Sequence, residues 1–360
     1  MKREREYGID ALRIVSMWMI LVLHILGQGG IIGRLEWPSF RYAAAWLLEA
    51  AAYGSVNCYG MISGYVGVHS KPKYSSILLL WIQVVFYSTI LSLAAHFIWP
   101  EMVSGSEWIK GFLPVNFKYY WYYSAYFFLS LLIPMINKAL KQANIRELAA
   151  GLTAIVLLSL NGTLFQKDAF LAGQGYSPLW LLALYMMGGY IKLHGEHLRV
   201  YRWIQKRPLL WYALGTTAAW GVKIAAGNRS LPIVFDQRLH SDMLLSYISP
   251  AIILSSVALF ALFAGWKPKE QLCKWLTVIA PATFGVYLIH VHPQIWRYCI
   301  ADAFISFTHI KAYVLPFAIL GAAVGILAVC IVIDLIRGKL FRLLKVKEGC
   351  QYLMERIGMS

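Results

Sequence analysis

Long apolar stretches separated by short polar segments follow one another from residue 9 to residue 336. A helix needs about 20 apolar residues to cross the hydrocarbon core of a bilayer, with a usable range of roughly 17 to 25. Ten stretches meet this requirement: residues 9–28, 43–66, 75–97, 119–137, 147–165, 177–193, 208–226, 243–264, 275–293 and 312–336. The pattern therefore predicts an all-α polytopic membrane protein with about ten transmembrane helices in one bundle.

Composition agrees with a membrane protein, because 59% of the residues are hydrophobic and only 14% are charged. A water-soluble domain of this length does not need so apolar a composition. No linker rich in Ser, Pro or Gly divides the chain, and no internal repeat is visible. We expect one membrane domain over residues 1–336 and a basic amphipathic cytoplasmic tail over residues 337–360 that lies on the inner leaflet.

The formal charge of +16 is distributed unevenly between the two sides of the predicted bundle. With a cytoplasmic amino terminus, the inner segments hold 22 of the 33 Lys and Arg residues and the outer segments hold nine. Cytoplasmic loops of membrane proteins carry this excess of positive charge. The asymmetry predicts a multi-pass protein of the plasma membrane with both termini in the cytoplasm. It also accounts for most of the charge without a nucleic-acid partner.

Two ionisable residues, Arg13 and His24, lie within the first apolar stretch. At about 100° per residue they fall within roughly 20° of one another on one helix face, and at about 1.5 Å per residue they are roughly 16 Å apart along the axis. Ionisable groups inside a membrane span are costly and usually mark a functional pathway. A cation near the inner end and an imidazole near the outer end therefore form a candidate site.

Glu49 lies in the second stretch at a depth comparable with that of His24. A carboxylate beside an imidazole holds the ring in one tautomer and stabilises its protonated form, which favours general-base catalysis. The alternative is a structural Glu49 that a hydroxyl satisfies or that lies among lipid headgroups.

The second stretch also carries Asn57 and Ser63, whose side chains can bond across helices. After it come Lys71 and Lys73, whose ammonium groups can meet either the phosphates of a ligand or lipid headgroups.

Aromatic residues crowd the start of the fourth stretch, where Trp121, Tyr122 and Tyr126 belong to an almost continuous run. Such a run exceeds what an interfacial belt requires, and its rings can form a platform for sugar faces. The ninth stretch ends with Tyr287 and His290, and His292 follows it. These imidazoles come to the depth of His24, which hints at function. Neither the histidines nor the five scattered cysteines form a metal-binding pattern, so we expect no metal.

Taken together and in this order, these motifs resemble the acyltransferase-3 family of bacterial integral membrane acyltransferases. Asp10, Arg13 and His24 match the amino-terminal signature of the family. Ser63-Gly64-Tyr65, Trp121 through Pro134, and Tyr287 through His290 match three further motifs, so the resemblance covers nearly the whole chain. Two positions depart from the family: Tyr126 stands where many glycan-modifying members have Glu, and a basic pair that is Arg-rich elsewhere is present as Lys71 and Lys73.

The resemblance implies transfer of an acyl group, usually acetyl, from cytosolic acyl-coenzyme A to a hydroxyl of a glycan or other cell-envelope acceptor outside the membrane. In this scheme the catalytic residues are His24 as the general base, Arg13, and Glu49 as a candidate partner of His24. Arg13, Asp10, Lys71 and Lys73 would bind the donor. The candidates for acceptor contact or for stabilising the oxyanion are Asn57, Ser63, Trp121, Tyr122, Tyr126, Tyr287 and His290.

A secondary transporter or exporter of a small or glycan-linked substrate is the main alternative, because helices with buried charge also suit transport. A partner subunit of an envelope assembly is a third hypothesis, for which the outer loops are short. Capsule or exopolysaccharide, wall polymer, lipid-linked sugar and a small secreted molecule are all compatible acceptors, and both acetyl and longer acyl groups are compatible donors.

Overall fold

The computed structural model describes residues 5–70, 73–102, 104–165, 168, 170–227, 233–234, 237–238 and 240–358. Its principal helices are α1 (Tyr7–Leu26), α2 (Phe40–Ala52), α3 (Ser55–Gly67), α4 (Tyr74–Ile98), α5 (Gly105–Phe112), α6 (Trp121–Gln142), α7 (Ile145–Phe165), α8 (Pro178–His194), α9 (Arg199–Lys206), α10 (Pro208–Ala226), α11 (Pro250–Ala264), α12 (Glu270–Ile279), α13 (Thr283–His290), α14 (Pro293–Ile295), α15 (Leu315–Leu343) and α16 (Val346–Arg356). Two residue pairs, β1 (Ile233–Val234) and β2 (Gln237–Arg238), form a small antiparallel ladder. The prediction of an all-α fold is confirmed.

Within the described residues, six helical segments are long and apolar enough to cross a membrane. They are Tyr7–Leu26, Tyr74–Ile98, Trp121–Gln142, Ile145–Leu164, Glu270–His290 and Leu315–Leu343, and α11 is a shorter apolar helix. The protein is therefore a multi-pass membrane protein. Each of the ten stretches expected from the sequence overlaps at least one helix.

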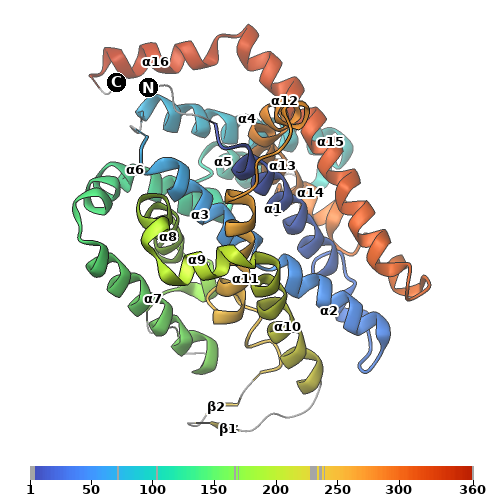
Figure 1. The fold of residues 1–360 in the computed structure, drawn as a ribbon. Coiled ribbons are helices and arrows are strands. Elements are labelled where there is room, and N and C mark those ends of the chain that lie inside the picture. Colours follow the sequence, from blue (N-terminus) through green and yellow to red (C-terminus); the bar gives the residue numbers. More distant parts are fainter. Residues whose placement is uncertain are drawn as a thin grey trace.

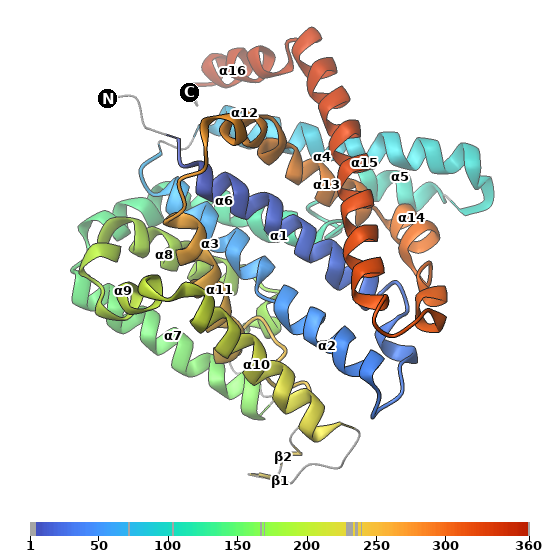
Figure 2. The same ribbon diagram turned by 45° about the vertical axis from the view of Figure 1, so that its right-hand side comes forward.

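Helix α1 runs through the middle of the bundle, where it contacts α2, α3, α11, α13 and α15 (Figure 1). Most of its residues are buried, including Leu12, Leu21 and Leu26, so α1 is surrounded by protein along most of its length. Figure 2 shows the same helix from another side, between α3 and α15. In both views the described ends of the chain lie at one end of the bundle.

The second apolar stretch is broken into α2 and α3 at Tyr53 and Gly54. A Cβ atom at Gly54 would lie 2.8 Å from the Oγ atom of Ser256 on α11, so this position needs glycine for close approach. A further close contact joins α3 to α8, because a Cβ atom at Gly64 would collide with the backbone carbonyl of Tyr185. Small residues let membrane helices approach in this way.

Helices α8 and α11 each begin at a Ser-Pro pair, which is a helix-start signal that is visible in the sequence. The hydroxyls of Ser177 and Ser249 accept hydrogen bonds from the backbone N–H groups of Trp180 and Ile252, and a proline follows each cap. Such a cap satisfies an N–H group that has no partner inside the helix, and proline fits the first helical position because its missing N–H is not needed there.

A buried carboxylate joins α13 to α4 and α15. Asp334 on α15 is 3% exposed and pairs with Arg337 one turn later at 2.8 Å. It also accepts hydrogen bonds from Tyr87 at 2.8 Å and Gln83 at 3.3 Å on α4. Because Asp334 packs directly against Gly285, this network fixes the position of α13. A buried charge with so many partners costs a great deal to break.

The tail that we expect to begin at residue 337 is largely helical in the structure. Helix α15 continues without a break past that residue to Leu343. The chain then turns at Lys345, and α16, in which Cys350 is buried, packs against α4. The predicted amphipathic segment is thus the end of α15 together with α16.

Candidate functional site

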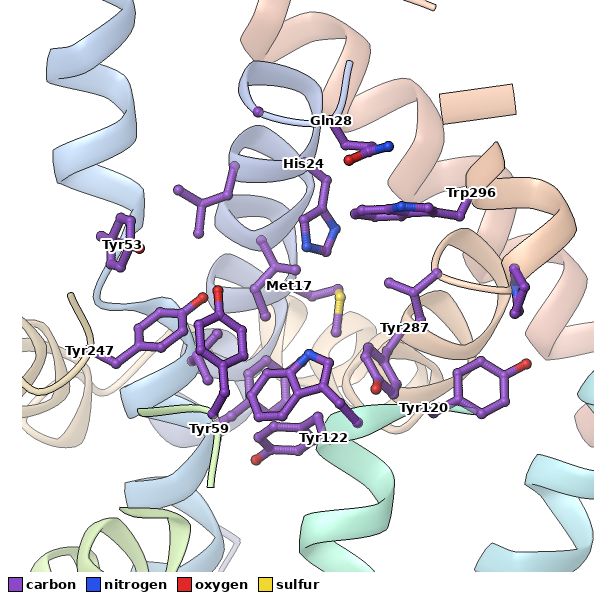
Figure 3. Close-up of a pocket in the computed structure, with 18 of the residues that line it drawn as sticks. Met17, His24, Gln28, Tyr53, Tyr59, Tyr120, Tyr122, Tyr247, Tyr287 and Trp296 are labelled. Carbon is purple, nitrogen blue, oxygen red and sulfur yellow. The ribbon is translucent and has the colours of Figure 1, made fainter. Parts of the chain in front are cut away.

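A cavity of about 730 Å³ lies beside the carboxyl-terminal half of α1 (Figure 3). Its wall comes from α1, from α2 and α3 on both sides of their break, from the start of α6, from α13 and from the segment that follows it. Met17, Ile20 and His24 of α1 and Gly27 at its carboxyl-terminal end line it, a spacing of three or four residues that places them on one face. Arg13 is one turn before Met17 on the same stripe. A cavity of this size is typical of a small-molecule site.

His24 projects into this cavity and is held there by a second histidine. The Nδ1 atom of His24 is 2.9 Å from the Nε2 atom of His290 on α13. The Nδ1 atom of His290 is in turn 2.6 Å from the backbone oxygen of Val286. A carbonyl oxygen only accepts, so Nδ1 of His290 carries the proton and its Nε2 atom is an acceptor. His24 therefore donates from Nδ1.

That hydrogen-bond order leaves the lone pair of neutral His24 on Nε2. The ring lines the cavity, and no described residue bonds to Nε2. On its other side the ring meets the edge of Trp296, with 4.6 Å between centroids and 87° between planes. His290 itself is only 1% exposed. The arrangement presents one oriented proton acceptor to the cavity, which is what a general base requires.

Aromatic side chains form a nearly continuous wall around the cavity. Starting from Tyr53, successive ring centroids are 5.0 Å apart to Tyr247, 5.1 Å to Tyr176 and 4.7 Å to Trp121. From Trp121 the series continues to Tyr122 and Tyr287, with centroid distances of 5.6 and 6.0 Å. It then reaches His290 and His24, with centroid distances of 6.4 and 5.1 Å. In Figure 3, Tyr53 and Tyr247 lie on one side of the cavity and Tyr120 lies on the other. Such a wall offers both apolar faces and phenol hydroxyls.

Tyr287 has an unused hydroxyl in this wall. Its side chain is buried and lines the cavity, but its Oη atom has no hydrogen-bond partner among the described residues. It precedes His290 by three residues, so both lie on the same side of α13. A buried hydroxyl without a partner is a hydrogen-bond donor that the described structure does not use.

Glu49 also lines the cavity, one helical turn before Tyr53. Its Oε2 atom is buried and has no partner in the described part of the chain. The ring nitrogen of His24 that a carboxylate would hold is already bonded to His290. The structure therefore brings Glu49 to the same cavity as His24, while His290 is the residue that contacts the imidazole.

At the amino-terminal end of α1, Asp10 lies between two arginines. Its carboxylate is 3.1 Å from Nη1 of Arg13 and 2.6 Å from Nε of Arg5. Arg13 keeps 29% of its side chain exposed, so part of the guanidinium remains open to a ligand. Arg13 does not line the cavity, but Tyr59 connects the two regions because its hydroxyl donates to the backbone oxygen of Arg13 at 2.9 Å.

Asn57 and Ser63 have structural contacts. Asn57 is fully buried, donates to the Tyr247 backbone oxygen at 2.8 Å and accepts from the Trp180 indole at 3.1 Å. It thereby ties α3 to α8 and to the segment before α11. The hydroxyl of Ser63 donates to the Tyr59 backbone oxygen one turn earlier.

Of the remaining predicted residues, some line the cavity and others lie away from it. Trp121 and Tyr122 line the cavity, whereas Tyr126 stacks against Tyr122 one turn further along α6. Lys73 is exposed just before α4, and Lys71 lies outside the described residues. His292 is fully buried, and its Nε2 atom is 3.2 Å from the Ser88 backbone oxygen. Across the described ranges, no group of three potential metal ligands comes together.

Several cavity residues did not stand out in the sequence. Tyr53 could have been found, because it follows Glu49 at a helical spacing of four residues. Tyr247 lies near the start of the stretch 243–264 and Trp296 lies beyond the stretch 275–293, and only the packing of distant segments brings them to the cavity. Gln28 and Arg297 add polar groups to the same wall.

Comparison with known families decides the class of this membrane protein. A family model for an acyltransferase domain matches residues 6–335, almost the whole chain. The chain belongs to the acyltransferase-3 family. With its membrane-spanning helices it is a membrane acyltransferase. A search of curated proteins and a search of solved structures found no match to this acyltransferase.

Proposed function

We propose that this acyltransferase moves an acetyl or other acyl group from cytosolic acyl-coenzyme A to a hydroxyl of a glycan or other cell-envelope acceptor on the outer side of the plasma membrane, and that His24 is the general base. The main support for this proposal is the chain of two hydrogen bonds from His24 to His290 and from His290 to the Val286 backbone oxygen. This chain leaves the lone pair of His24 on Nε2, toward the cavity. Membership of an acyltransferase family supplies the reaction class.

In this proposal the acceptor hydroxyl gives its proton to Nε2 of His24 while its oxygen attacks the thioester carbonyl. The tetrahedral intermediate carries an oxyanion, for which the unpartnered hydroxyl of Tyr287 is the best-placed donor among the candidates. The C–S bond then breaks, and His24 returns the proton to the leaving thiolate. The products are an acyl ester and free coenzyme A, so atoms and charge balance. The buried ring of His290 keeps His24 in the required tautomer throughout.

The donor enters from the side of the termini in this account. A thioester made in the cytosol meets Arg13 and Asp10 first, with Lys71 and Lys73 as further candidate contacts for its phosphates. The cavity begins one turn beyond Arg13 on the same stripe of α1. An extended pantetheine arm along this stripe would carry the acyl group toward His24. Tyr59 lies between the two regions and must leave room for the arm.

The membrane topology follows from the same proposal. About ten spans with both termini in the cytoplasm place His24 and its cavity near the outer surface. The excess of basic residues in the inner segments supports this orientation. The basic tail predicted over residues 337–360 would then be on the cytoplasmic side, with α16 along the inner leaflet.

Mass spectrometry of envelope glycans from cells with and without the gene tests the proposal. The gene should add an ester-linked acyl group, and the His24→Ala variant should not restore it. If the acylation is unchanged by deletion while a glycan precursor accumulates in the cytoplasm, the protein is an exporter and the proposal is wrong.

A further inference from the structure

The carboxyl group of Glu49 has bonding capacity that the described part of the protein does not use. Its Oε2 atom is buried beside the cavity without a hydrogen-bond partner, and no described Lys, Arg or His side chain forms an ion pair with it. A carboxyl group can form hydrogen bonds through both of its oxygens. Buried polar groups normally have partners, so a carboxyl group that lines a cavity and has an unpartnered oxygen points to a ligand.

The neighbours of Glu49 narrow the chemistry of that ligand. Tyr53 follows one turn later on α2, and its ring is 5.0 Å from that of Tyr247. These rings offer flat apolar faces next to a carboxylate. A sugar ring has the complementary surface, since its C–H groups form an apolar face and its hydroxyls project from the edge.

A small organic cation would also suit aromatic faces and a carboxylate. The other polar groups of the cavity favour hydroxyls instead. Gln28 and the tyrosine phenols both donate and accept hydrogen bonds, as hydroxyls do, whereas an ammonium group only donates. Arg297 adds a positive charge to the same wall, which opposes a cationic ligand.

We propose that Glu49 anchors the acceptor by hydrogen bonds to two adjacent hydroxyls of a sugar ring, whose C–H face lies on Tyr53 and Tyr247, while another hydroxyl of the acceptor reaches His24. This inference rests on the proposed function and specifies its acceptor as a carbohydrate with a free vicinal diol apart from the acylated position. Glu49 is then a binding residue for the acceptor and not the partner of His24.

The direct test measures binding of one defined glycan preparation to the full-length protein in nanodiscs. The probe is the envelope glycan of the source cell, treated with mild alkali to remove its ester-linked acyl groups. A second sample of the same glycan is oxidised with periodate and reduced, which cleaves vicinal diols. Choline serves as the cationic probe. The variants are wild type, Glu49→Gln and, as a matched control, Glu36→Gln, which makes the same change at an exposed carboxyl outside the cavity.

Wild type and Glu36→Gln should bind the alkali-treated glycan equally and lose roughly tenfold or more affinity for the periodate-treated sample, as expected when hydrogen bonds to a buried carboxyl group are removed. Glu49→Gln should bind the intact glycan roughly tenfold more weakly than wild type and should discriminate little between the two samples. Equal binding by Glu49→Gln and Glu36→Gln, no binding of the intact glycan by wild type, or preference for choline would each overturn the inference.

Kinetics separates this inference from the proposed function. In acyl transfer to the same glycan, Glu49→Gln should raise the half-saturating acceptor concentration more than it lowers the maximal rate, and the pH profile should keep its shape. A changed acidic limb would make Glu49 the partner of His24 and overturn the inference, while leaving the proposed function in place. Absence of transfer by wild type would contradict the proposed function itself, whatever the binding result.

Discussion

The Nδ1 atom of His24 lies 2.9 Å from the Nε2 atom of His290, although the two residues are 266 positions apart in the chain. Since His290 donates from its other nitrogen to the Val286 backbone oxygen, the pair has one consistent set of proton positions. His24 then faces the cavity with a lone pair and not with an N–H group. The proposed chemistry depends on this orientation.

Replacing His290 should therefore impair catalysis without disrupting the fold. His290→Phe keeps an aromatic ring but removes the acceptor for Nδ1–H of His24, and we expect kcat to fall at least about tenfold, which corresponds to roughly 1.4 kcal/mol of lost orientation. His290→Gln keeps an oxygen acceptor and should retain more activity than His290→Phe. Steady-state rates of acyl transfer, measured with equal amounts of folded protein, check this ranking of activities. Equal activity of both variants and wild type would remove His290 from the mechanism.

Tyr287→Phe should lower the activity of the protein without lowering its stability. If its hydroxyl stabilises the oxyanion, the loss of this donor should lower kcat about 10²- to 10³-fold. Because that buried hydroxyl has no partner in the described structure, its removal should leave thermal stability unchanged or slightly raised. Tyr123→Phe is the matched control, since the Tyr123 hydroxyl is also buried without a partner but does not line the cavity. A similar loss of activity in both variants would argue for packing alone.

Arg13 should bind the donor through its positive charge more than through bidentate hydrogen bonds of its guanidinium group. Only Nη1 contacts Asp10, at 3.1 Å, so a lysine can supply a comparable contact. Arg13→Ala should raise the KM for acyl-coenzyme A strongly, and Arg13→Lys should recover part of that affinity. Arg34→Ala, at an exposed ion pair with Asp302, should leave the KM for the donor unchanged. No change of this KM in Arg13→Ala would exclude Arg13 from donor binding.

Topology can be tested with single cysteines. In a variant whose Cys273 and Cys299 are replaced by Ser, Arg202→Cys on α9 should react with an impermeant maleimide only after the membrane is opened. Glu36→Cys should react in intact cells. Both positions are exposed in the structure, so accessibility reports the side of the membrane. The reverse labelling pattern would place His24 near the cytoplasm and contradict the proposed route of the acyl group.

The sequence predicts the helical class and the polar stripe of α1 well, because both follow from periodicity within one segment. It also indicates that His24 and His290 share a depth. It does not reveal that their rings touch, because that contact depends on the docking of α13 against α1. Asn57 illustrates the same limit: an amide in a membrane helix suits catalysis and packing equally, and only its neighbours Tyr247 and Trp180 show that it joins helices.

The break between α2 and α3 at Tyr53 could not be predicted from the sequence, because the apolar pattern of residues 43–66 continues through it. The close approach of Gly54 to Ser256 on α11 is a tertiary contact that local propensity does not contain. The buried Asp334 is different. An ionisable residue inside the last apolar stretch is visible in the sequence, and the arginine one turn later could have identified it as a paired charge.

Transfer of labelled acetyl from acetyl-coenzyme A to the deacylated envelope glycan, in proteoliposomes, tests the central role of His24 most directly. His24→Ala should lower the rate about 10²- to 10⁴-fold, as expected for loss of a general base. His309→Ala, which removes an exposed imidazole away from the cavity, should transfer acetyl like wild type. Each variant must be inserted and monodisperse in equal amount. Transfer by His24→Ala at the wild-type rate would contradict the proposed mechanism.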